Sequence, residues 1–473
     1  MIPVILRNFL SLAFGRFTAL AIGALVTFVL ARALGVESYG EFIAALASAE
    51  LFAAFLDLGL SRILVKEGSV DRKRVGGHLA NILLIKSLLS AAVLLLVHLL
   101  ALRMGWMSPL YQLTMLLMLC KVADSFGIMF DGVFQVFQRM EYSAIILVTG
   151  RVFLLISVLA GWVSGRGILY FGWLYFLISA LTAMATVLIA SRRFASPKSG
   201  MISLRETVGR EGIFFAISSI LYMVNSRVDM LVLREWASPE ALGLYASAIR
   251  LALVFQILPM VLQAAVLPVL FDYGRNQRER LPGFYRDYLR RSLLLSLFPL
   301  LLLGLFPQEL IGTLFGENYL PAAGWLKWLA LLLPLRFLSL APGNLLTALD
   351  RQRERTLCVS SGVALTLFLM FWRVPAGGVG SVIVALISGE ALMAALCLLA
   401  AFRQGYGVDL KMLARVLVAL AVSALLLSGV QRILDPGFLG AIFLLPLLVI
   451  PSILLSRAAS LQELREIVRR PTP

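Results

Sequence analysis

Seven basic side chains lie deep within stretches of sequence that are otherwise apolar. They are Arg16, Lys86, Lys121, Arg151, Arg227, Arg250 and Arg336. A charge at the bilayer centre costs at least about 2.5–3.5 kcal/mol, so such residues normally face a cavity or a partner. The planar guanidinium of arginine binds phosphate oxygens in pairs. A polar cavity lined by such cations would suit an anionic substrate such as a diphosphate. The candidate ligands are Arg16, Lys86, Arg151, Arg250 and Arg336.

Acidic side chains occupy the same apolar stretches. They are Glu50, Asp57, Asp124, Asp131, Asp229 and Glu390. Glu50 and Asp57 are seven residues apart and share one helical face, whereas Lys121 and Asp124 are three apart and can pair within one helix. Buried ion pairs that hold helices together are the alternative interpretation of these charges. None of the candidate arginines Arg16, Arg151, Arg250 and Arg336 has an acid three or four residues away, so a partner would have to come from another helix.

The sequence lacks the motifs that ATP hydrolysis and metal binding usually require. The sequence contains no GxxxxGK[ST] phosphate loop and no HExxH motif, and its two histidines, His78 and His98, are too far apart for a histidine cluster. Its three cysteines lie in apolar segments. We therefore expect no metal, no cofactor and no ATP hydrolysis by that route. The connections expected outside the membrane are short, which argues against a membrane enzyme that polymerises or ligates sugars.

Composition identifies the class of protein that must position these side chains. The chain has 473 residues, of which 60% are hydrophobic and only 14% charged, with a mean hydropathy of +0.92. A soluble domain has about 25% charged residues. These values predict an all-α integral membrane protein and exclude a soluble enzyme, a nucleic-acid-binding protein and a disordered scaffold. The net charge of +16 is explained by the cytoplasmic bias of Lys and Arg in membrane proteins.

Fourteen stretches are long and apolar enough to cross a bilayer, which takes about 20 residues. They are 9–34, 39–61, 78–101, 109–137, 142–164, 168–191, 211–234, 240–268, 289–308, 321–348, 356–373, 377–402, 412–430 and 437–456. The fourth, eighth and tenth are interrupted by Gly or Pro, so we expect tilts or kinks there. The connections on one side hold 28 Lys and Arg residues and those on the other hold five, which places both termini in the cytoplasm.

A weak internal repeat indicates how these helices are organised. At an offset of 203 residues, Glu37 aligns with Glu240, Gly40 with Gly243, Phe42 with Tyr245 and Ala45 with Ala248; at 212, Arg139 aligns with Arg351 and Gly150 with Gly362. Repeats that start on the same side are related by an axis along the membrane normal. We expect two parallel six-helix lobes around a central cavity, plus two extra C-terminal helices. The predicted parts are an N-lobe (1–191), a cytoplasmic linker (192–210), a C-lobe (211–403) and spans 13–14 with a cytoplasmic tail (404–473).

Five local segments carry a family resemblance. They are ARALGVESYGEF between spans one and two, DLGLSRILVKE at the end of span two, ALGLYASAIRL at the start of span eight, LFGENYLPAAGWLKWLALLLPLRFL leading into span ten, and NLLTALDRQRERT at its end. In the second segment, Asp57, Gly59, Arg62 and Glu67 stand at the family's positions. In order and spacing the segments resemble the polysaccharide transport branch of the MOP (multidrug/oligosaccharidyl-lipid/polysaccharide) superfamily, which includes the O-antigen and lipid-linked oligosaccharide flippases.

The resemblance implies a flippase rather than an enzyme. Such proteins move polyprenyl-diphosphate-linked glycans across the cytoplasmic (inner) membrane by alternating access, for cell-surface polysaccharide biosynthesis, in some cases beside a polymerase or export partner. We expect sugar hydroxyls to contact Tyr222, Asn225 and Asn344 while the basic residues bind the diphosphate. A coupled cation, a proton or the membrane potential would drive the cycle. The candidate coupling or gating residues are Glu50, Asp57, Lys121, Asp124, Arg227 and Asp229.

Three other functions stay open at this point. Lipid II flippases of the same superfamily use arginines in spans one, two and eight, whereas span two here has Glu50 and Asp57 in that region. This departure favours an oligosaccharide flippase. A multidrug or organic-cation antiporter would need a net acidic cavity, and the seven deep basic residues argue against one. A non-transporting scaffold of an export complex would tolerate the loss of every cavity charge.

Overall fold

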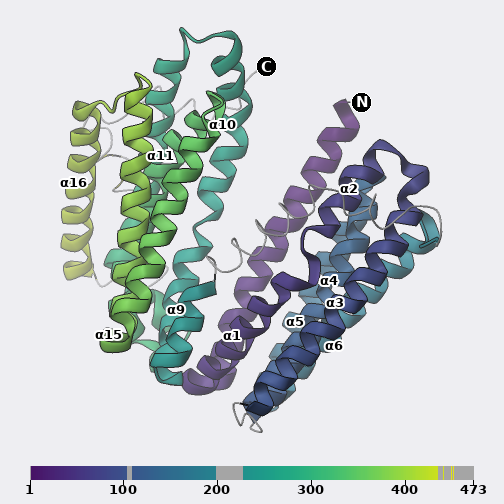
Figure 1. Cartoon of the computed structure of the whole chain (residues 1–473). Helices are drawn as coiled ribbons and strands as arrows, with labels where there is room; N and C mark the ends of the chain where they lie inside the picture. Colours follow the sequence, from purple (N-terminus) through teal and green to yellow (C-terminus); the bar gives the residue numbers. More distant parts are fainter. Residues whose placement is uncertain are drawn as a thin grey trace. The chain divides into compact units, whose positions relative to one another are not determined.

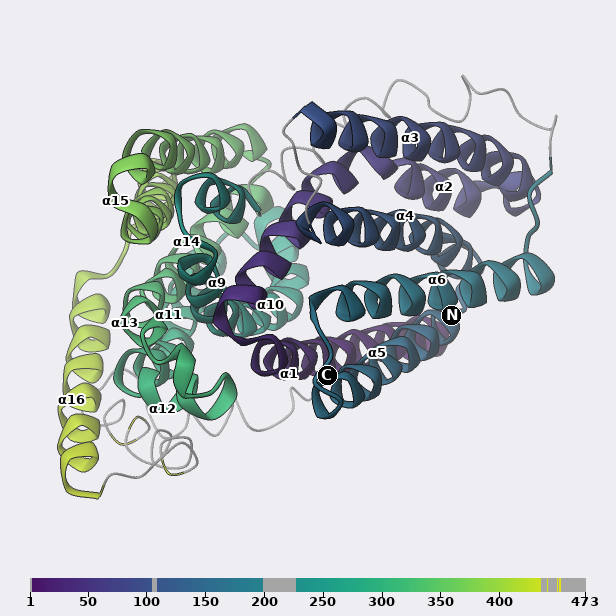
Figure 2. The same ribbon diagram turned by 90° about the horizontal axis from the view of Figure 1, so that it is seen from below.

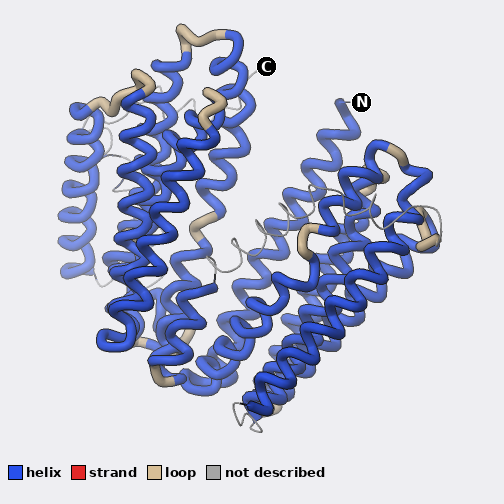
Figure 3. Tube along the Cα trace, in the orientation of Figure 1, coloured by secondary structure: helices blue, strands red, loops and turns tan. Residues whose placement is uncertain are grey.

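The computed structural model describes residues 2–103, 109–198 and 227–434, with isolated positions 440, 449 and 451 beyond them. Within this part of the chain every regular element is a helix (Figure 3). Ten of the helical segments found there are long and apolar enough to cross a membrane. The chain is therefore an all-helical, multi-pass membrane protein, as its composition predicts.

Two of these segments are long enough to cross twice. α1 (Ile2–Asp57) has 56 residues and α15 (Gln352–Arg403) has 52, whereas a helix that rises about 1.5 Å per residue spans the hydrocarbon core in about 20 residues. α1 bends at Gly35 (φ 74°) and α15 bends at Gly378 (φ 53°), in a backbone region that glycine adopts without steric penalty. Both bends lie within two residues of a predicted connection. Predicted spans seven and fourteen fall mostly outside the described residues.

The chain divides into two compact units, Met1–Gly243 and Leu244–Pro473. The first contains α1, α2 (Leu60–Val70), the 3₁₀ turn η1 (Arg72–Arg74), α3 (Val75–Arg103), α4 (Pro109–Val136), α5 (Met140–Val163) and α6 (Ile168–Arg193). α1 packs on α4 and α5, while α4 lies between α2 and α6 (Figures 1 and 2). Fully buried Phe42, Leu117 and Phe171 belong to one core cluster of this unit, and Leu64, Met129 and Phe134 belong to a second.

The second unit continues from α9 (Pro239–Val254) into further helices. They are α10 (Ile257–Asn276), α11 (Leu281–Leu305), α12 (Pro307–Leu314), α13 (Ala322–Leu329), α14 (Leu332–Ala348), α15 and α16 (Leu410–Leu434), with the 3₁₀ turn η2 (Glu317–Tyr319) between α12 and α13. α14 packs on α10, α11 and α15. Its residues Phe337, Leu345 and Leu346 are fully buried, so α14 forms the centre of this unit.

The structure breaks the predicted eighth and tenth spans, as their Gly and Pro residues indicate. The eighth is divided into α9 and α10 around Gln256, just before Pro259, which has no N–H to donate to the carbonyl of Phe255. Leu258 N–H binds that carbonyl instead, at 3.1 Å. The predicted fourth span stays one continuous helix, α4. Its Gly132 serves close packing, because a Cβ there would lie 3.2 Å from a methyl group of Val65.

One backbone turn occurs at both positions of the 212-residue offset. α4 and α14 end in the same turn, in which Gln138 (φ 56°) and Asp350 (φ 58°) adopt the left-handed conformation. Arg139 N–H then donates to Phe134 O and Arg351 N–H donates to Leu346 O, each at 2.8 Å. All three pairs of positions differ by 212 residues. The turn is therefore built twice from different side chains, as an internal duplication predicts.

Gly40 and Gly243, which align at the 203-residue offset, lie in close contact within the first unit. A Cβ on Gly40 would lie 1.8 Å from the carbonyl oxygen of Pro239, and a Cβ on Gly243 would lie 2.2 Å from that of Val36. Val36 and Pro239 also differ by 203 residues, so the contact is reciprocal, as a local two-fold axis would make it. The backbones can approach this closely only because neither glycine has a side chain.

We expect Gly40→Ala to destabilise the protein by about 1–3 kcal/mol, because the new methyl group would overlap a backbone carbonyl that cannot rotate away. Gly23→Ala is the matched control on the same helix, since its Cβ would meet nothing within 4 Å. Alanine in a helix interior is more stable than glycine, so this control should be neutral or slightly stabilising. Thermal unfolding of both purified variants measures the difference. Equal unfolding temperatures would contradict the close contact.

Candidate functional site

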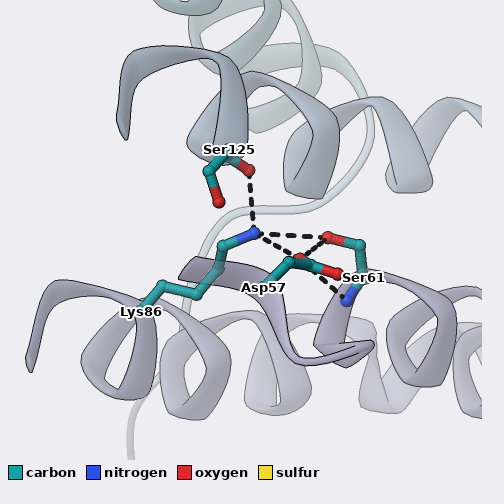
Figure 4. A network of polar contacts seen from close by, with 4 residues as sticks. All are labelled: Asp57, Ser61, Lys86 and Ser125. Atoms are coloured by element: carbon teal, nitrogen blue, oxygen red, sulfur yellow. Dashed lines mark hydrogen bonds and ion pairs between the residues drawn. The ribbon is translucent and has the colours of Figure 1, made fainter. Parts of the chain in front are cut away.

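A fully buried lysine lies at the centre of a polar cluster in the first unit. The Nζ atom of Lys86, on α3, donates to Asp57 Oδ1 at 2.5 Å, to Ser125 O at 2.8 Å and to Ser61 Oγ at 3.3 Å (Figure 4). The Lys86 side chain is 0% exposed and that of Asp57 is 32% exposed. An ammonium group has three protons, and here each has an oxygen acceptor. Lys86 therefore neutralises Asp57 and has no donor left for a substrate.

The chain positions Asp57 by breaking a helix beside it. Asp57 is the last residue of α1, and Leu58 (φ 45°) and Gly59 (φ 79°) then take left-handed conformations before α2 begins. The Asp57 carboxylate accepts hydrogen bonds from both the backbone N–H and the hydroxyl of Ser61 in the first turn of α2. A carboxylate at a helix break can thus satisfy freed backbone groups and still bind a cation, as in the broken helices of transporters.

Glu50 binds two cations two turns before Asp57. Its Oε2 lies 2.6 Å from Arg227 Nε, and its Oε1 lies 3.2 Å from Lys121 Nζ. Lys121, on α4, thus pairs with a different helix instead of with Asp124 of its own. Lys121 is one turn from Ser125, whose carbonyl binds Lys86. Glu50 and Asp57 share one helical face, as their spacing predicts. The charged residues along this face are Asp57, Lys86, Glu50, Lys121 and Arg227, and we call this row the charge ladder. It links α1, α3 and α4.

Two further predicted coupling residues, Asp124 and Asp229, and the intramembrane acid Asp131 lie on α4 and on a short helix before α9. Asp124 Oδ2 lies 3.9 Å from Cys120 Sγ, which also contacts Ser179 Oγ at 3.1 Å. Asp229 is half-buried on the short helix formed by residues 227–236. Asp131 accepts a hydrogen bond from Gln135, one turn along α4. In the part of the chain that the structure describes, no group of three or more His, Cys, Asp or Glu side chains is placed to hold a metal ion.

The described part of the second unit contains one deep ion pair and one amide network. Arg336 Nε lies 2.8 Å from Glu390 Oε1, which joins α14 to α15. Asn344 is buried and donates to Tyr288 Oη at 2.8 Å, while its own oxygen accepts from Gln263 Nε2 at 2.9 Å. Arg336 is thus neutralised and Asn344 is engaged within the protein.

Three of the predicted diphosphate ligands differ from Lys86 and Arg336, because they are not in ion pairs among the described residues. Among the described residues, Arg16 on α1, Arg151 on α5 and Arg250 on α9 have no carboxylate partner. Arg16 and Arg151 are exposed in the isolated chain, and Arg250 is half-buried. α1 and α5 pack closely beside Arg16, because a Cβ on Gly15 would lie 2.6 Å from Ala144 Cβ. Arg151 follows Ala144 by two helical turns and therefore lies on the same face of α5.

Residues 5–273 match the family described as "Polysaccharide biosynthesis protein". This match covers more than half of the chain. The chain belongs to this family. No protein with a curated function matches the sequence.

Solved structures show the fold that this family member adopts. It is similar to the lipid II flippase MurJ in an inward closed conformation (TM-score 0.69, 15% identity, covering 97% of this chain and 99% of that one). It is also similar to an inward-facing multidrug resistance MATE family transporter of the MOP superfamily (0.62, 17%, 81% and 94%) and to a MOP superfamily transporter from Pyrococcus furiosus (0.57, 16%, 85% and 95%). The family match confirms the predicted resemblance to polysaccharide proteins, and the solved structures with a similar fold are transporters or flippases.

In this family member the structure sorts the predicted site residues into two groups. The cations Lys86, Lys121, Arg227 and Arg336 are paired with carboxylates, whereas Arg16, Arg151 and Arg250 are not paired within the described residues. Tyr222 and Asn225 lie outside those residues. Four residues of these networks were not predicted from the sequence: Ser61, Ser125, Gln263 and Tyr288. Only Ser61 and Ser125 carried a signal, since each is one turn from a predicted charge.

Proposed function

We propose that this protein is a flippase that moves lipid-diphosphate-linked oligosaccharides or polysaccharide repeat units across the cytoplasmic membrane, with both termini in the cytoplasm. The observation that carries the proposal is the set of three membrane-depth arginines, Arg16, Arg151 and Arg250, that have no carboxylate partner among the described residues of a polysaccharide biosynthesis protein. Arginines within a bilayer are costly unless they face a cavity or a partner. A diphosphate supplies such a partner, and the bidentate guanidinium geometry suits it.

The mechanism keeps the polyprenyl tail in the lipid while the diphosphate and its sugars cross through the protein. The arginines bind the diphosphate and neutralise its charge, which is the largest barrier to crossing. Tyr222 and Asn225 contact sugar hydroxyls, and Asn344 fixes Tyr288 and Gln263 for the same purpose. The lobes, residues 1–191 and 211–403, alternate between inward- and outward-open forms. No ATP is consumed by this chain.

In this mechanism the ion pairs hold neighbouring helices together in one conformation. The Lys86–Asp57, Glu50–Lys121 and Arg336–Glu390 pairs each join two different helices, so a change of conformation can break them and a reverse change can restore them. A proton or cation that binds Glu50 or Asp57 would release its lysine. Asp124, Asp229 and Arg227 are the remaining candidates for coupling, within or close to the charge ladder.

Export complementation tests the proposal in cells that lack their own oligosaccharide flippase. Lipid-linked intermediates are extracted and analysed by mass spectrometry, with and without this protein. Accumulation of a diphosphate-linked oligosaccharide that clears when the protein is restored supports the proposal, and the mass identifies the glycan. Clearance of lipid-linked peptidoglycan precursor alone would instead indicate a lipid II flippase. Altered sensitivity to cationic dyes, without any accumulated glycan lipid, would favour a multidrug antiporter.

A further inference from the structure

A basic pocket lies in the first unit at the ends of α3 and α6 that the charge distribution predicts to be cytoplasmic. Its cavity volume is about 330 Å³. Five cations line it, Arg72, Lys73, Arg192, Arg193 and Lys198, and its lining among the described residues includes no acidic side chain. This pocket is separate from the charge ladder around Glu50 and Asp57. A volume of this size falls within the range of small-molecule sites in proteins.

Backbone contacts hold the walls of the pocket together. The N–H of Lys198 donates to the carbonyl of Gly76 at 2.8 Å, which ties the segment after α6 to the first turn of α3. A Cβ on Gly76 would lie 2.7 Å from Ser196 O, so this close approach requires glycine. On the other wall, the Asp71 carboxylate accepts from the backbone N–H of Lys73 at 3.0 Å and fixes the start of η1.

Aromatic side chains orient two of the five cations. The Arg72 guanidinium lies over the Phe137 ring, 5.5 Å from its centre. Arg193 donates to Tyr142 Oη at 2.8 Å and lies over the same ring. All five cations are exposed, and none has a carboxylate partner among the described residues. The pocket therefore presents uncompensated positive charge, with Arg72 and Arg193 held by aromatic rings, and such charge suits an anion.

We propose that this pocket binds the phosphate group of an anionic ligand, and that the ligand is the headgroup of an anionic phospholipid. Basic pockets at the cytoplasmic ends of membrane helices suit such headgroups. The surface of α3 agrees with this source, because Leu84 and Leu88, about two and three turns after Gly76, are 52% and 64% exposed and offer an apolar surface to acyl chains. The inference does not depend on the proposed transport function.

Native mass spectrometry of the purified protein with added phosphatidylglycerol tests the proposal, with phosphatidylcholine as the zwitterionic comparison. The test variant is K73Q/R192Q/K198Q, since these three side chains have no hydrogen bond, ion pair or ring contact among the described residues. The matched control is R275Q/R280Q/R286Q, which removes the same charge from exposed positions of the second unit. We expect the test variant to bind phosphatidylglycerol at least about tenfold more weakly than the wild type, and the control to stay within twofold.

A second arm distinguishes the two sources of phosphate. Inorganic phosphate or pyrophosphate is added at millimolar concentration to the wild-type complex. Retained phosphatidylglycerol supports the lipid headgroup, whereas displacement of the lipid by these ions supports the phosphate site but assigns it to a soluble anion. Thermal unfolding first checks that both triple variants are folded. Equal phosphatidylglycerol binding by the wild type and a folded test variant would overturn the proposal.

Discussion

Replacing Arg250 with glutamine is expected to reduce export of lipid-linked oligosaccharide about 10- to 150-fold while the protein still inserts into the membrane. A hydrogen bond to a charged group contributes about 1.5–3 kcal/mol, and about 1.4 kcal/mol is a tenfold change in affinity. Glutamine cannot offer the paired donors of a guanidinium or its charge. Arg16→Gln and Arg151→Gln should have effects of the same size, because neither arginine has a carboxylate partner among the described residues. Accumulated glycan lipid, measured in the complementation cells, reports the loss.

Two controls separate substrate binding from loss of charge alone. Arg286→Gln removes an exposed cation of α11 and should export normally. Arg250→Lys keeps the charge but loses the planar fork, so its export should lie between those of the wild type and Arg250→Gln. Protein levels in the membrane are compared by immunoblot. Normal export by Arg16→Gln and Arg250→Gln together would show that these arginines do not bind the diphosphate.

Asp57→Asn is expected to destabilise the protein by about 3–5 kcal/mol, because it leaves a fully buried ammonium group without its counter-charge. Lys86→Met should have a smaller effect, about 1–3 kcal/mol. The reason for the asymmetry is exposure, since the Asp57 side chain is 32% exposed and keeps its hydrogen bonds from Ser61, whereas Lys86 is 0% exposed. The double variant Asp57→Asn/Lys86→Met should be more stable than the sum of the single effects predicts. Chemical unfolding in detergent measures all three.

The matched control for this cycle is an ion pair near the surface. Arg351 and Glu354 are 54% and 32% exposed, so Arg351→Gln should change the free energy of unfolding by no more than about 1 kcal/mol. Strictly additive effects of the Asp57 and Lys86 substitutions would mean that the two side chains do not interact.

The apolar stretches of the sequence predict most of the helical fold for a physical reason. A membrane helix must satisfy all its backbone groups internally, so length and hydropathy alone identify it. Glycine likewise marks the bends at Gly35 and Gly378. The break after Asp57 was not predicted, because it requires the left-handed conformation of Leu58, which nothing in a leucine side chain indicates.

Only the features of the site that depend on spacing along a single helix were predicted. The common face of Glu50 and Asp57 follows from their separation along one helix. The partner of Lys121 does not, because Asp124 is within reach on the same helix but Glu50 lies on the helix packed against it. Arg336 and Glu390 are 54 residues apart, and only the packing of α14 on α15 joins them. Spacing identifies which charges need partners, whereas tertiary structure decides which partners they receive.

The most direct measurement of the central claim is translocation in vesicles that contain only the purified protein and lipid. A lipid-diphosphate-linked oligosaccharide is placed in one leaflet, and an enzyme that cannot cross the bilayer reports its arrival in the other. We expect time-dependent arrival with the wild type, and arrival that is strongly reduced with Arg250→Gln. A correctly folded wild-type protein that moves cationic dyes but leaves the glycan lipid in its starting leaflet would contradict the proposed function.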